Sequence, residues 1–273
     1  MKTCFNTITS GDRPLRDTIT FCGKYGYQGI EIDKEHLNRH LVQNSVTDLR
    51  AQLTDNNISV AGLMAFPFLP FASEKELDRS LDEYRAGAER AAQIGAPTLL
   101  TFIGQPPPPG VATDELFARA GDAAREYGSV AAEFGLSVAL EPIGLAPFMS
   151  TPAEALRIAT KSGLDNVGII MDTFHYFKSS IPLSQIEAIP VGKLLICHVN
   201  DAPDVPREQL EDSDRVYCGL GAIPLVDEFR LLKRMGYDGY LSVEIFNPDY
   251  WNDDHETVIR KSKEHLDSVL SQL

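Results

Sequence analysis

Eight short apolar runs rich in β-forming residues alternate with longer amphipathic segments along the chain. Several of these runs are apolar almost throughout, which is typical of parallel strands that are buried on both faces. The expected strands cover residues 2–7, 27–32, 58–64, 97–103, 136–143, 167–174, 194–200 and 240–246. Because a helical pattern separates each strand from the next, consecutive strands are expected to lie parallel in one sheet.

The segments between the strands carry apolar residues at steps of three and four, as amphipathic helices do. The two longest patterns consist of Leu77, Leu81, Tyr84, Ala88 and Ala91, and of Phe117, Ala120, Ala124, Tyr127, Ala131 and Phe134. Residues 151–154 (TPAE) predict a capping box with proline at the first helical position. Helices are expected to stop at four glycines, namely Gly95, Gly135, Gly163 and Gly236.

Eight strands and about eight helices in strict alternation predict an α/β fold, a single-domain (β/α)8 barrel over residues 1–273, near the usual length of ~250 residues. An open doubly wound sheet is the alternative. That fold calls for a glycine-rich first turn, and residues 6–14 (NTITSGDRP) contain none. No segment has the composition of a linker, and residues 105–110 (QPPPPG) are expected to form a stiff loop.

The charge and the cysteines limit the possible partners and location. The chain has 39 acidic and 25 basic residues and a formal net charge of -14, so a nucleic-acid partner is not expected. The N-terminus lacks the pattern of a signal peptide, and no stretch reaches the roughly 18 apolar residues that span a bilayer. The four cysteines form no CxxC pair. We therefore expect free thiols, a cytoplasmic location and no membrane partner.

Polar side chains stand at the carboxyl ends of five expected strands, where the active site of such a barrel lies. Glu31 follows the second strand, and Glu141, Asp172, His198 and Glu244 follow the fifth to the eighth. One such residue alone is usually a helix cap, a surface group or a hydrogen-bonded core residue. Four on successive strands would repel one another without a cation. We therefore expect these four to bind one divalent metal ion, namely Mn, Co, Mg or Zn.

A metal beside these carboxylates predicts a specific chemistry. It would stabilise the enediolate that forms when a carbon between a carbonyl and a hydroxyl loses a proton. Glu141 and Glu244, separated by two strands, could flank the substrate as general base and general acid. His175, on the loop expected after Asp172, could bind a substrate hydroxyl or carbonyl, although a locally packed loop histidine explains it as well.

Four short motifs carry a resemblance to a known family, namely ALEPIG, MDTFH, CHVND and LSVEIF. In this order they resemble the xylose isomerase-like superfamily of sugar isomerases, epimerases and apurinic-site endonucleases. The resemblance covers the second half closely and the first half mainly through the alternation of strands and helices. It implies a metal bound by Glu141, Asp172, His198 and Glu244, proton exchange by Glu141 and Glu244, and substrate contacts from His175 and Arg215.

Within the superfamily, residues 198–225 and 243–251 look most like the branch of 2-keto-myo-inositol (inosose) isomerases. That branch has an acidic insert after the seventh-strand histidine, an arginine before a GxG turn and an aromatic loop after the last glutamate. These features correspond to Arg215, Gly219–Gly221, and Tyr250 with Trp251. Four aromatic residues are expected to wall the pocket, namely Phe66, Phe68, Phe71 and Trp251, although core packing explains any one of them equally well.

Two interpretations from other classes compete. An apurinic-site endonuclease of this superfamily resembles a three-zinc phosphodiesterase and needs more histidines than the six present. The third and fourth strand ends (GLMAFPF and LTFIGQ) offer none, and the DRH motif of that branch reads Asp214-Arg215-Val216 here. A catalytically empty binding module would have lost its polar strand ends, which this chain keeps.

The sequence therefore predicts a metal-dependent isomerase or epimerase of a polyhydroxylated ketone, with inosose isomerisation as the best single choice. The alternative is a dehydratase of an oxidised cyclitol or 3-keto sugar, because both reactions begin with the same deprotonation. The only partner expected besides the metal is the small-molecule substrate. A homodimer is the expected assembly, because related barrels often associate.

Overall fold

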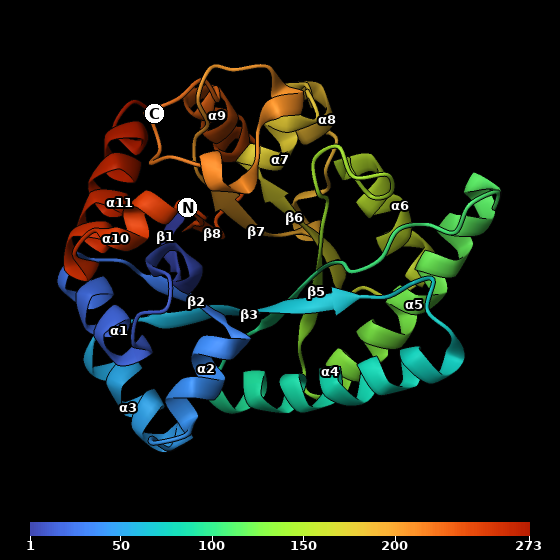
Figure 1. The fold of residues 1–273 in the computed structure, drawn as a ribbon, viewed down its shortest axis with the longest axis horizontal. Coiled ribbons are helices and arrows are strands. Elements are labelled where there is room, and N and C mark those ends of the chain that lie inside the picture. Colours follow the sequence, from blue (N-terminus) through green and yellow to red (C-terminus); the bar gives the residue numbers. More distant parts are fainter.

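The eight strands close into one parallel barrel in which each strand pairs with the next along the chain and β8 pairs with β1. A computed structural model describes residues 1–273, and Figure 1 shows the barrel with its surrounding helices. The strands are β1 Lys2–Asn6, β2 Gly29–Asp33, β3 Ser59–Phe68, β4 Thr98–Ile103, β5 Ser137–Glu141, β6 Val167–Asp172, β7 Leu194–Val199 and β8 Tyr240–Val243. The predicted barrel fold is confirmed, with strand bounds shifted by a few residues.

Eleven α-helices surround the barrel, where about eight were expected. They are α1 Leu15–Lys24, α2 Lys34–Leu41, α3 Val46–Asp55, α4 Glu74–Ile94, α5 Thr113–Glu133, α6 Pro152–Ser162, α7 Thr173–Lys178, α8 Leu183–Glu187, α9 Leu225–Met235, α10 Pro248–Asn252 and α11 His255–Leu270. The additional helices arise because three connections hold two each, after β2, β6 and β8. The second helix after β2 starts at its own capping box, in which Ser45 and Asp48 bond reciprocally.

Local signals in the sequence set several helix ends. The capping box at Thr151 and Glu154 starts α6, as predicted. Gly95, Gly163 and Gly236 end α4, α6 and α9 in the left-handed conformation that glycine adopts at little cost. These caps fix where each helix returns its chain to the barrel.

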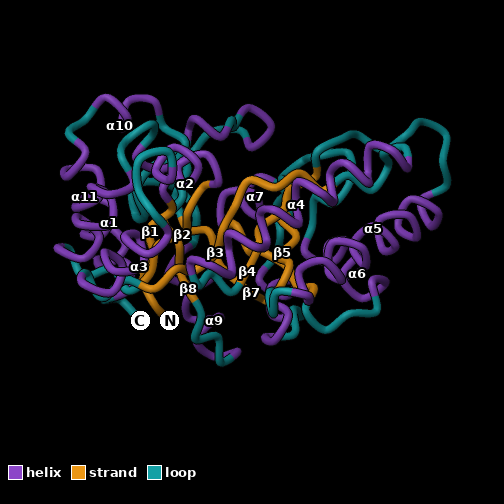
Figure 2. The backbone as a smooth tube through the Cα atoms, turned by 90° about the horizontal axis from the view of Figure 1, so that it is seen from below, coloured by secondary structure: helices purple, strands orange, loops and turns teal.

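Two hydrophobic layers hold the barrel together. A cluster of 62 buried residues, among them Phe5, Ile30 and Val138, includes residues of both the strands and the surrounding helices. A separate cluster of seven buried residues fills the barrel interior, and its members are Cys4, Ala61, Met64, Leu100, Ala139, Ile170 and Ile196. Figure 2 shows the strands enclosed by helices. The barrel is therefore a packed core, with room for a site only at one end.

The four cysteines are buried free thiols, as predicted from their spacing. None of the helices combines the length and the apolar character that crossing a bilayer requires.

Candidate active site

The alternation of the strands brings the predicted metal ligands to one end of the barrel interior. Ile170 and Ile196 belong to the inner cluster, and Asp172 and His198 follow them two residues later on β6 and β7. Side chains two residues apart on a strand point to the same face, so both polar groups also face inward. The two residues are direct neighbours in the β6–β7 pairing. Glu141 stands in the same relation to Ala139 on β5.

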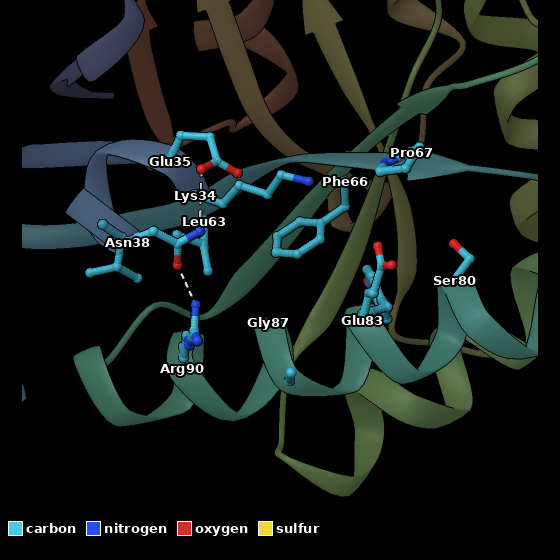
Figure 3. A pocket seen from close by; sticks show the side chains of 13 residues that line it. Lys34, Glu35, Asn38, Leu63, Phe66, Pro67, Ser80, Glu83, Gly87 and Arg90 are labelled. Atoms are coloured by element: carbon cyan, nitrogen blue, oxygen red, sulfur yellow. Dashed lines mark hydrogen bonds between the residues drawn. The ribbon is translucent and has the colours of Figure 1, made fainter. Parts of the chain in front are cut away.

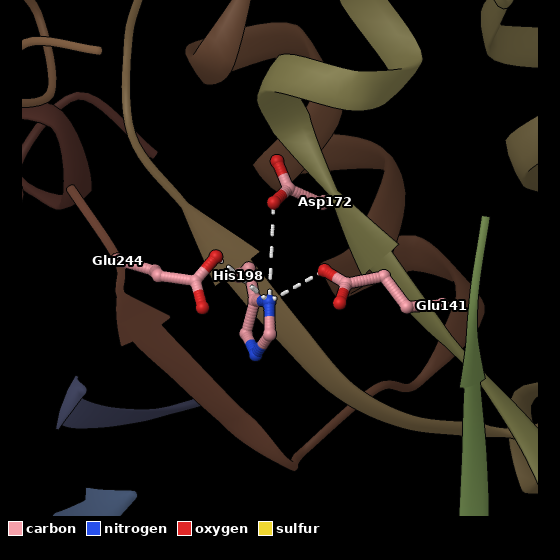
Figure 4. Close-up of side chains that lie close together, drawn as sticks. All are labelled: Glu141, Asp172, His198 and Glu244. Atoms are coloured by element: carbon pink, nitrogen blue, oxygen red, sulfur yellow. Dashed lines mark hydrogen bonds and ion pairs between the residues drawn. The ribbon is translucent and has the colours of Figure 1, made fainter. Parts of the chain in front are cut away.

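Glu141, Asp172, His198 and Glu244 converge on one point, as Figure 4 shows. One ligand atom from each lies within 4.8 Å of the others. His198 Nδ1 is 2.9 Å from Glu141 Oε1, 3.2 Å from Glu244 Oε2 and 3.8 Å from Asp172 Oδ2. The structure thus brings together all four residues that the sequence predicts as metal ligands.

The other ring nitrogen of His198 is held from inside the barrel by Glu31. His198 Nε2 lies 2.9 Å from Glu31 Oε1, and both side chains are fully buried. Ser242 Oγ donates to the second oxygen of Glu31 at 2.6 Å. A carboxylate that holds one nitrogen of a histidine orients the other nitrogen toward an ion, which is common at metal centres.

Arg215 reaches the cluster from the long loop between β7 and α9. Its Nη1 donates to Asp172 Oδ2 and to Glu244 Oε2, both at 2.8 Å. Its Nη2 donates to Asp212 Oδ1 at 2.8 Å and lies 3.2 Å from His175 Nε2. With 1 % of its surface exposed, Arg215 is a buried cation that needs such acidic partners. Arg215 thus lies beside His175, the other residue for which the family resemblance implies a substrate contact.

Asp172 also determines where His175 lies. Its Oδ1 accepts hydrogen bonds from the backbone N–H groups of Phe174 and His175 and so caps α7. His175 was expected on a loop, but it lies in this short helix because the cap starts a helix directly after β6. The cap fixes the direction in which His175 enters the pocket.

Burial and charge shift the pKa values of the cluster in different directions. Burial, partly opposed by His198, raises the pKa of Glu141 to about 7. Burial also acts to raise the pKa of Asp172, but the charges of Arg215 and the two histidines outweigh it and hold that pKa below its usual value. Burial acts to lower the pKa of His198, but the neighbouring carboxylates raise it well above its ordinary value. The buried carboxylates of the cluster therefore favour a positive charge among them, as the carboxylates of a metal centre do.

The donor set fits a divalent ion. Three carboxylates and one imidazole, all buried, offer mainly oxygen ligands, which suit Mn, Mg, Co or Zn. Glu31 supplies the outer partner that a ligating histidine usually has.

A hollow of about 280 Å³ opens beside the cluster. Its lining residues are Ile8, Asp33, Met64, Ala65, Phe102, Glu141, Ile143, His175, Asp212, Arg215, Glu244 and Phe246. A cavity of this size suits a small molecule. Both proposed proton carriers, Glu141 and Glu244, face it together with His175 and Arg215.

The phenylalanines predicted to wall this pocket lie elsewhere. Ala65 has a positive φ of 76°, and the pairing of β3 with β4 shifts between Leu63 and Phe66. This irregularity interrupts the regular alternation of β3 side chains between the barrel interior and the helices. Phe66 consequently packs against Tyr84 of α4 and lines a separate groove that contains residues of α2 and α4, shown in Figure 3.

The other predicted aromatic residues also contact the helices and loops. Phe68 packs on Tyr127 of α5, and Phe71 packs on Phe148. Trp251 lies outside the pocket lining, since its indole N–H donates to the backbone oxygen of Ile8 and a Cβ on Gly11 would lie 3.0 Å from its ring. Trp251 therefore contacts Ile8 of the lining without being part of the lining itself.

Three polar residues that the sequence did not single out contribute to the site. Asn6 donates to Glu244 Oε1 at 3.0 Å and fixes that carboxylate. Asp33 and Asp212 line the pocket. Asn6 and Asp33 end β1 and β2, so the strand-end pattern could have found them, whereas Asp212 lies in a long loop without any periodicity.

Comparison with known proteins agrees with this geometry. The model of the family described as xylose isomerase-like TIM barrel matches residues 19–269. An inosose isomerase of Bacillus velezensis is 28% identical over the whole chain and 98% of that protein. A crystal structure of the IolI protein with a bound zinc atom superposes with a TM-score of 0.92 at 28% identity, covering 99% of this chain and 98% of that one. A 3-dehydroshikimate dehydratase of Pseudomonas aeruginosa is 26% identical over 82% of this chain and 35% of its own length.

Proposed function

The chain belongs to the xylose isomerase-like TIM barrel family, and we propose that it is a divalent-metal-dependent isomerase of a keto-inositol. The observation that carries the proposal is the convergence of four ligand atoms within 4.8 Å beside a pocket that Glu141 and Glu244 both face. The inosose isomerase of Bacillus velezensis and the zinc-bound IolI structure, each 28% identical over almost the whole chain, support the choice of substrate and cofactor.

Glu141, Asp172, His198 and Glu244 would hold the ion, in keeping with their donor types. Held by these residues, a divalent ion would supply Lewis-acid polarisation of a substrate carbonyl and would offset negative charge that develops on its oxygen. We favour zinc because the IolI structure contains it, and manganese, cobalt and magnesium suit the same donors.

Glu141 and Glu244 are the proposed proton carriers. One accepts the proton from the hydroxyl-bearing carbon beside the carbonyl, and the other returns a proton to the former carbonyl carbon. The carbonyl changes place when the hydroxyl proton also passes to the other oxygen. Asn6 and Arg215 orient Glu244, whereas the hydrogen bond of the Glu141 side chain goes to His198 alone. Glu141 therefore has the greater freedom to move with the proton.

His175 and Arg215 are the proposed substrate-binding residues. Both line the pocket, and their side chains lie 3.2 Å apart at Nε2 and Nη2. Burial lowers the pKa of His175, so its ring is neutral near pH 7 and can donate or accept a hydrogen bond from a hydroxyl group. Trp251 is proposed to support this wall indirectly, through its hydrogen bond to Ile8.

A dehydratase of an oxidised cyclitol or 3-keto sugar is the second candidate function. The 26% identity to a 3-dehydroshikimate dehydratase favours it, but this chain matches only 35% of that protein. An endonuclease is disfavoured, because the pocket lining contains no histidine besides His175 that could serve further metal ions. The four free thiols support our proposal of a cytoplasmic location.

Solvent exchange tests the proposed function. Zinc-loaded protein is incubated in deuterated water with 2-keto-myo-inositol, and the positions that acquire deuterium are found by NMR. We expect label on the carbons flanking the carbonyl, together with a rearranged ketone, and neither after treatment with a chelator. Loss of water without rearrangement identifies a dehydratase instead. No label and no product from any keto-inositol or keto-sugar would contradict both candidates.

A further inference from the structure

The pocket that the proposed reaction uses has an excess of acidic side chains. Four of its lining residues are acids, namely Asp33, Glu141, Asp212 and Glu244, and Arg215 is the only lysine or arginine among them. A bound dication adds two positive charges, and Asp172 adds another negative charge behind the lining. Five carboxylates thus still face three positive charges.

Arg215 is the only lysine or arginine of the lining, and both of its terminal nitrogens already donate to carboxylates. Nη1 donates to Asp172 and Glu244, and Nη2 donates to Asp212 at 2.8 Å. Asp172 and Glu244 belong to the proposed metal centre, whereas Asp212 has no other role there. Asp212 is therefore the acidic partner of Nη2 outside the proposed metal centre, and a ligand carboxylate or phosphate would have to compete with it for this nitrogen, which also lies 3.2 Å from His175 Nε2.

The carboxylate of Asp212 lies where a ligand entering the pocket would meet it. It begins a 3-10 turn, Asp212–Asp214, in the loop after β7, and 55% of its side chain is exposed. Its partner Arg215 is buried directly behind it. An incoming anion would meet this carboxylate first and would compete with it for the same guanidinium nitrogen. Like charges brought together in this way strongly disfavour binding.

Asp33 gives the pocket a second acceptor of the same kind. Its Oδ1 accepts from the backbone N–H groups of Glu35 and His36, which holds the carboxylate at the end of β2. Hydroxyl groups donate to carboxylates in short, strong hydrogen bonds. The pair Asp33 and Asp212 therefore suits a ligand that is rich in hydroxyl groups and uncharged.

We infer that Asp212 is a specificity-determining residue that restricts this pocket to uncharged polyhydroxylated ketones by occupying Arg215. This inference rests on the proposed function and narrows it. It excludes substrates that carry a carboxylate, such as 3-dehydroshikimate, and sugar phosphates. An uncharged cyclitol or sugar ketone fulfils every condition that the lining imposes.

Two ligands that share one hydroxylated ring and differ in the charge of one substituent test the inference. Shikimate carries a carboxylate on a hydroxylated ring, and methyl shikimate is its uncharged ester. Their binding to zinc-loaded protein is measured by titration calorimetry for the wild type and for Asp212→Asn, Asp212→Glu and Asp204→Asn. The first variant removes the charge, the second keeps it, and the third removes an exposed acid from the same loop outside the pocket.

We expect the wild type to prefer the ester by about ten-fold or more, and Asp212→Asn to reduce this preference to about two-fold. Asp212→Glu and Asp204→Asn should keep the wild-type preference. Equal binding of acid and ester by the wild type would overturn the inference, and so would an unchanged preference in Asp212→Asn.

Deuterium exchange into 2-keto-myo-inositol, measured on the same preparations, separates this result from the proposed function. If deuterium exchange occurs and Asp212→Asn keeps the wild-type ligand preference, the role of Asp212 is rejected and the proposed isomerase activity is retained. A lost preference without exchange supports the role of Asp212 and rejects the isomerase.

Discussion

His198 Nε2 lies 2.9 Å from Glu31 Oε1 inside the barrel, while Nδ1 of the same ring faces the carboxylates of Glu141 and Glu244. The buried carboxylate thus fixes the imidazole from behind. Ser242 holds the second oxygen of Glu31, so the carboxylate itself is also fixed. The arrangement leaves Nδ1 as the nitrogen available for an ion.

Glu31→Ala should weaken zinc binding by about 10- to 100-fold, because outer partners of ligating histidines have effects of that size. Competition with a chromogenic chelator measures the affinity. Glu31→Gln retains an oxygen beside Nε2 and should lose less. Ser242→Ala removes only the outer hydrogen bond and serves as the matched control. Wild-type zinc affinity in a folded Glu31→Ala protein would refute the role assigned to Glu31.

The alternation of strands and helices predicted the barrel, and the strand ends predicted the four clustered side chains. Both depend on patterns that are local in the sequence, namely apolar runs, helical periodicity and the last residues of each strand. The buried partners of the cluster were harder to find. Arg215 contacts Asp172 from 43 residues away, and only the family resemblance pointed to it. The role of Asp212 depends on that contact, so no local pattern could have shown it.

Glu141→Gln and Glu244→Gln should each reduce turnover of the keto-inositol by about 10²- to 10⁴-fold, since glutamine cannot carry the proton. Steady-state rates with zinc-saturated protein measure the effect. Zinc content is determined for each variant, because both residues are also proposed ligands. Glu187→Gln on the exposed surface of α8 is the control and should keep the wild-type rate. A variant that keeps full turnover removes its glutamate from proton transfer.

His175→Ala should raise the KM for the ketone about ten-fold or more, because it removes a hydrogen-bonding group from the pocket wall. His175 packs near Phe174 and is buried, so thermal unfolding is measured alongside. His175→Gln keeps a polar group of similar reach and should recover part of the loss. If KM and turnover both stay at the wild-type level, His175 has only a packing role.

The phenylalanines of β3 show where period-two reasoning fails. A regular strand would direct Met64, Phe66 and Phe68 to the same face, but the irregularity at Ala65 separates Met64 from the other two. Met64 lines the pocket, whereas Phe66 and Phe68 pack on Tyr84 and Tyr127. A positive φ at an alanine is uncommon, and no local sequence pattern predicts it at Ala65.

The buried carboxyl group of Glu228 is expected to make the free energy of unfolding depend on pH. This side chain of α9 is buried, and its Oε2 has no hydrogen-bond partner. Burial raises the pKa of Glu228 from its ordinary value of 4.5 to about 8, with smaller contributions from Asp172 and Asp201. Between those two pH values the folded protein holds a proton that the unfolded chain has released. The free energy of unfolding from this group therefore falls as the pH rises through that range.

Glu228→Gln replaces the carboxyl by an uncharged group of the same size, so this part of the pH dependence should disappear. Urea unfolding at pH 5 should give similar stability for the variant and the wild type. At pH 9 the variant should be the more stable protein, by on the order of 2 kcal/mol. Asp238→Asn changes an exposed acid just after the same helix that does not contribute to the Glu228 pKa, and it should leave the pH profile of the wild type unchanged. Parallel pH profiles for Glu228→Gln and the wild type would mean that Glu228 does not retain a proton in the folded protein.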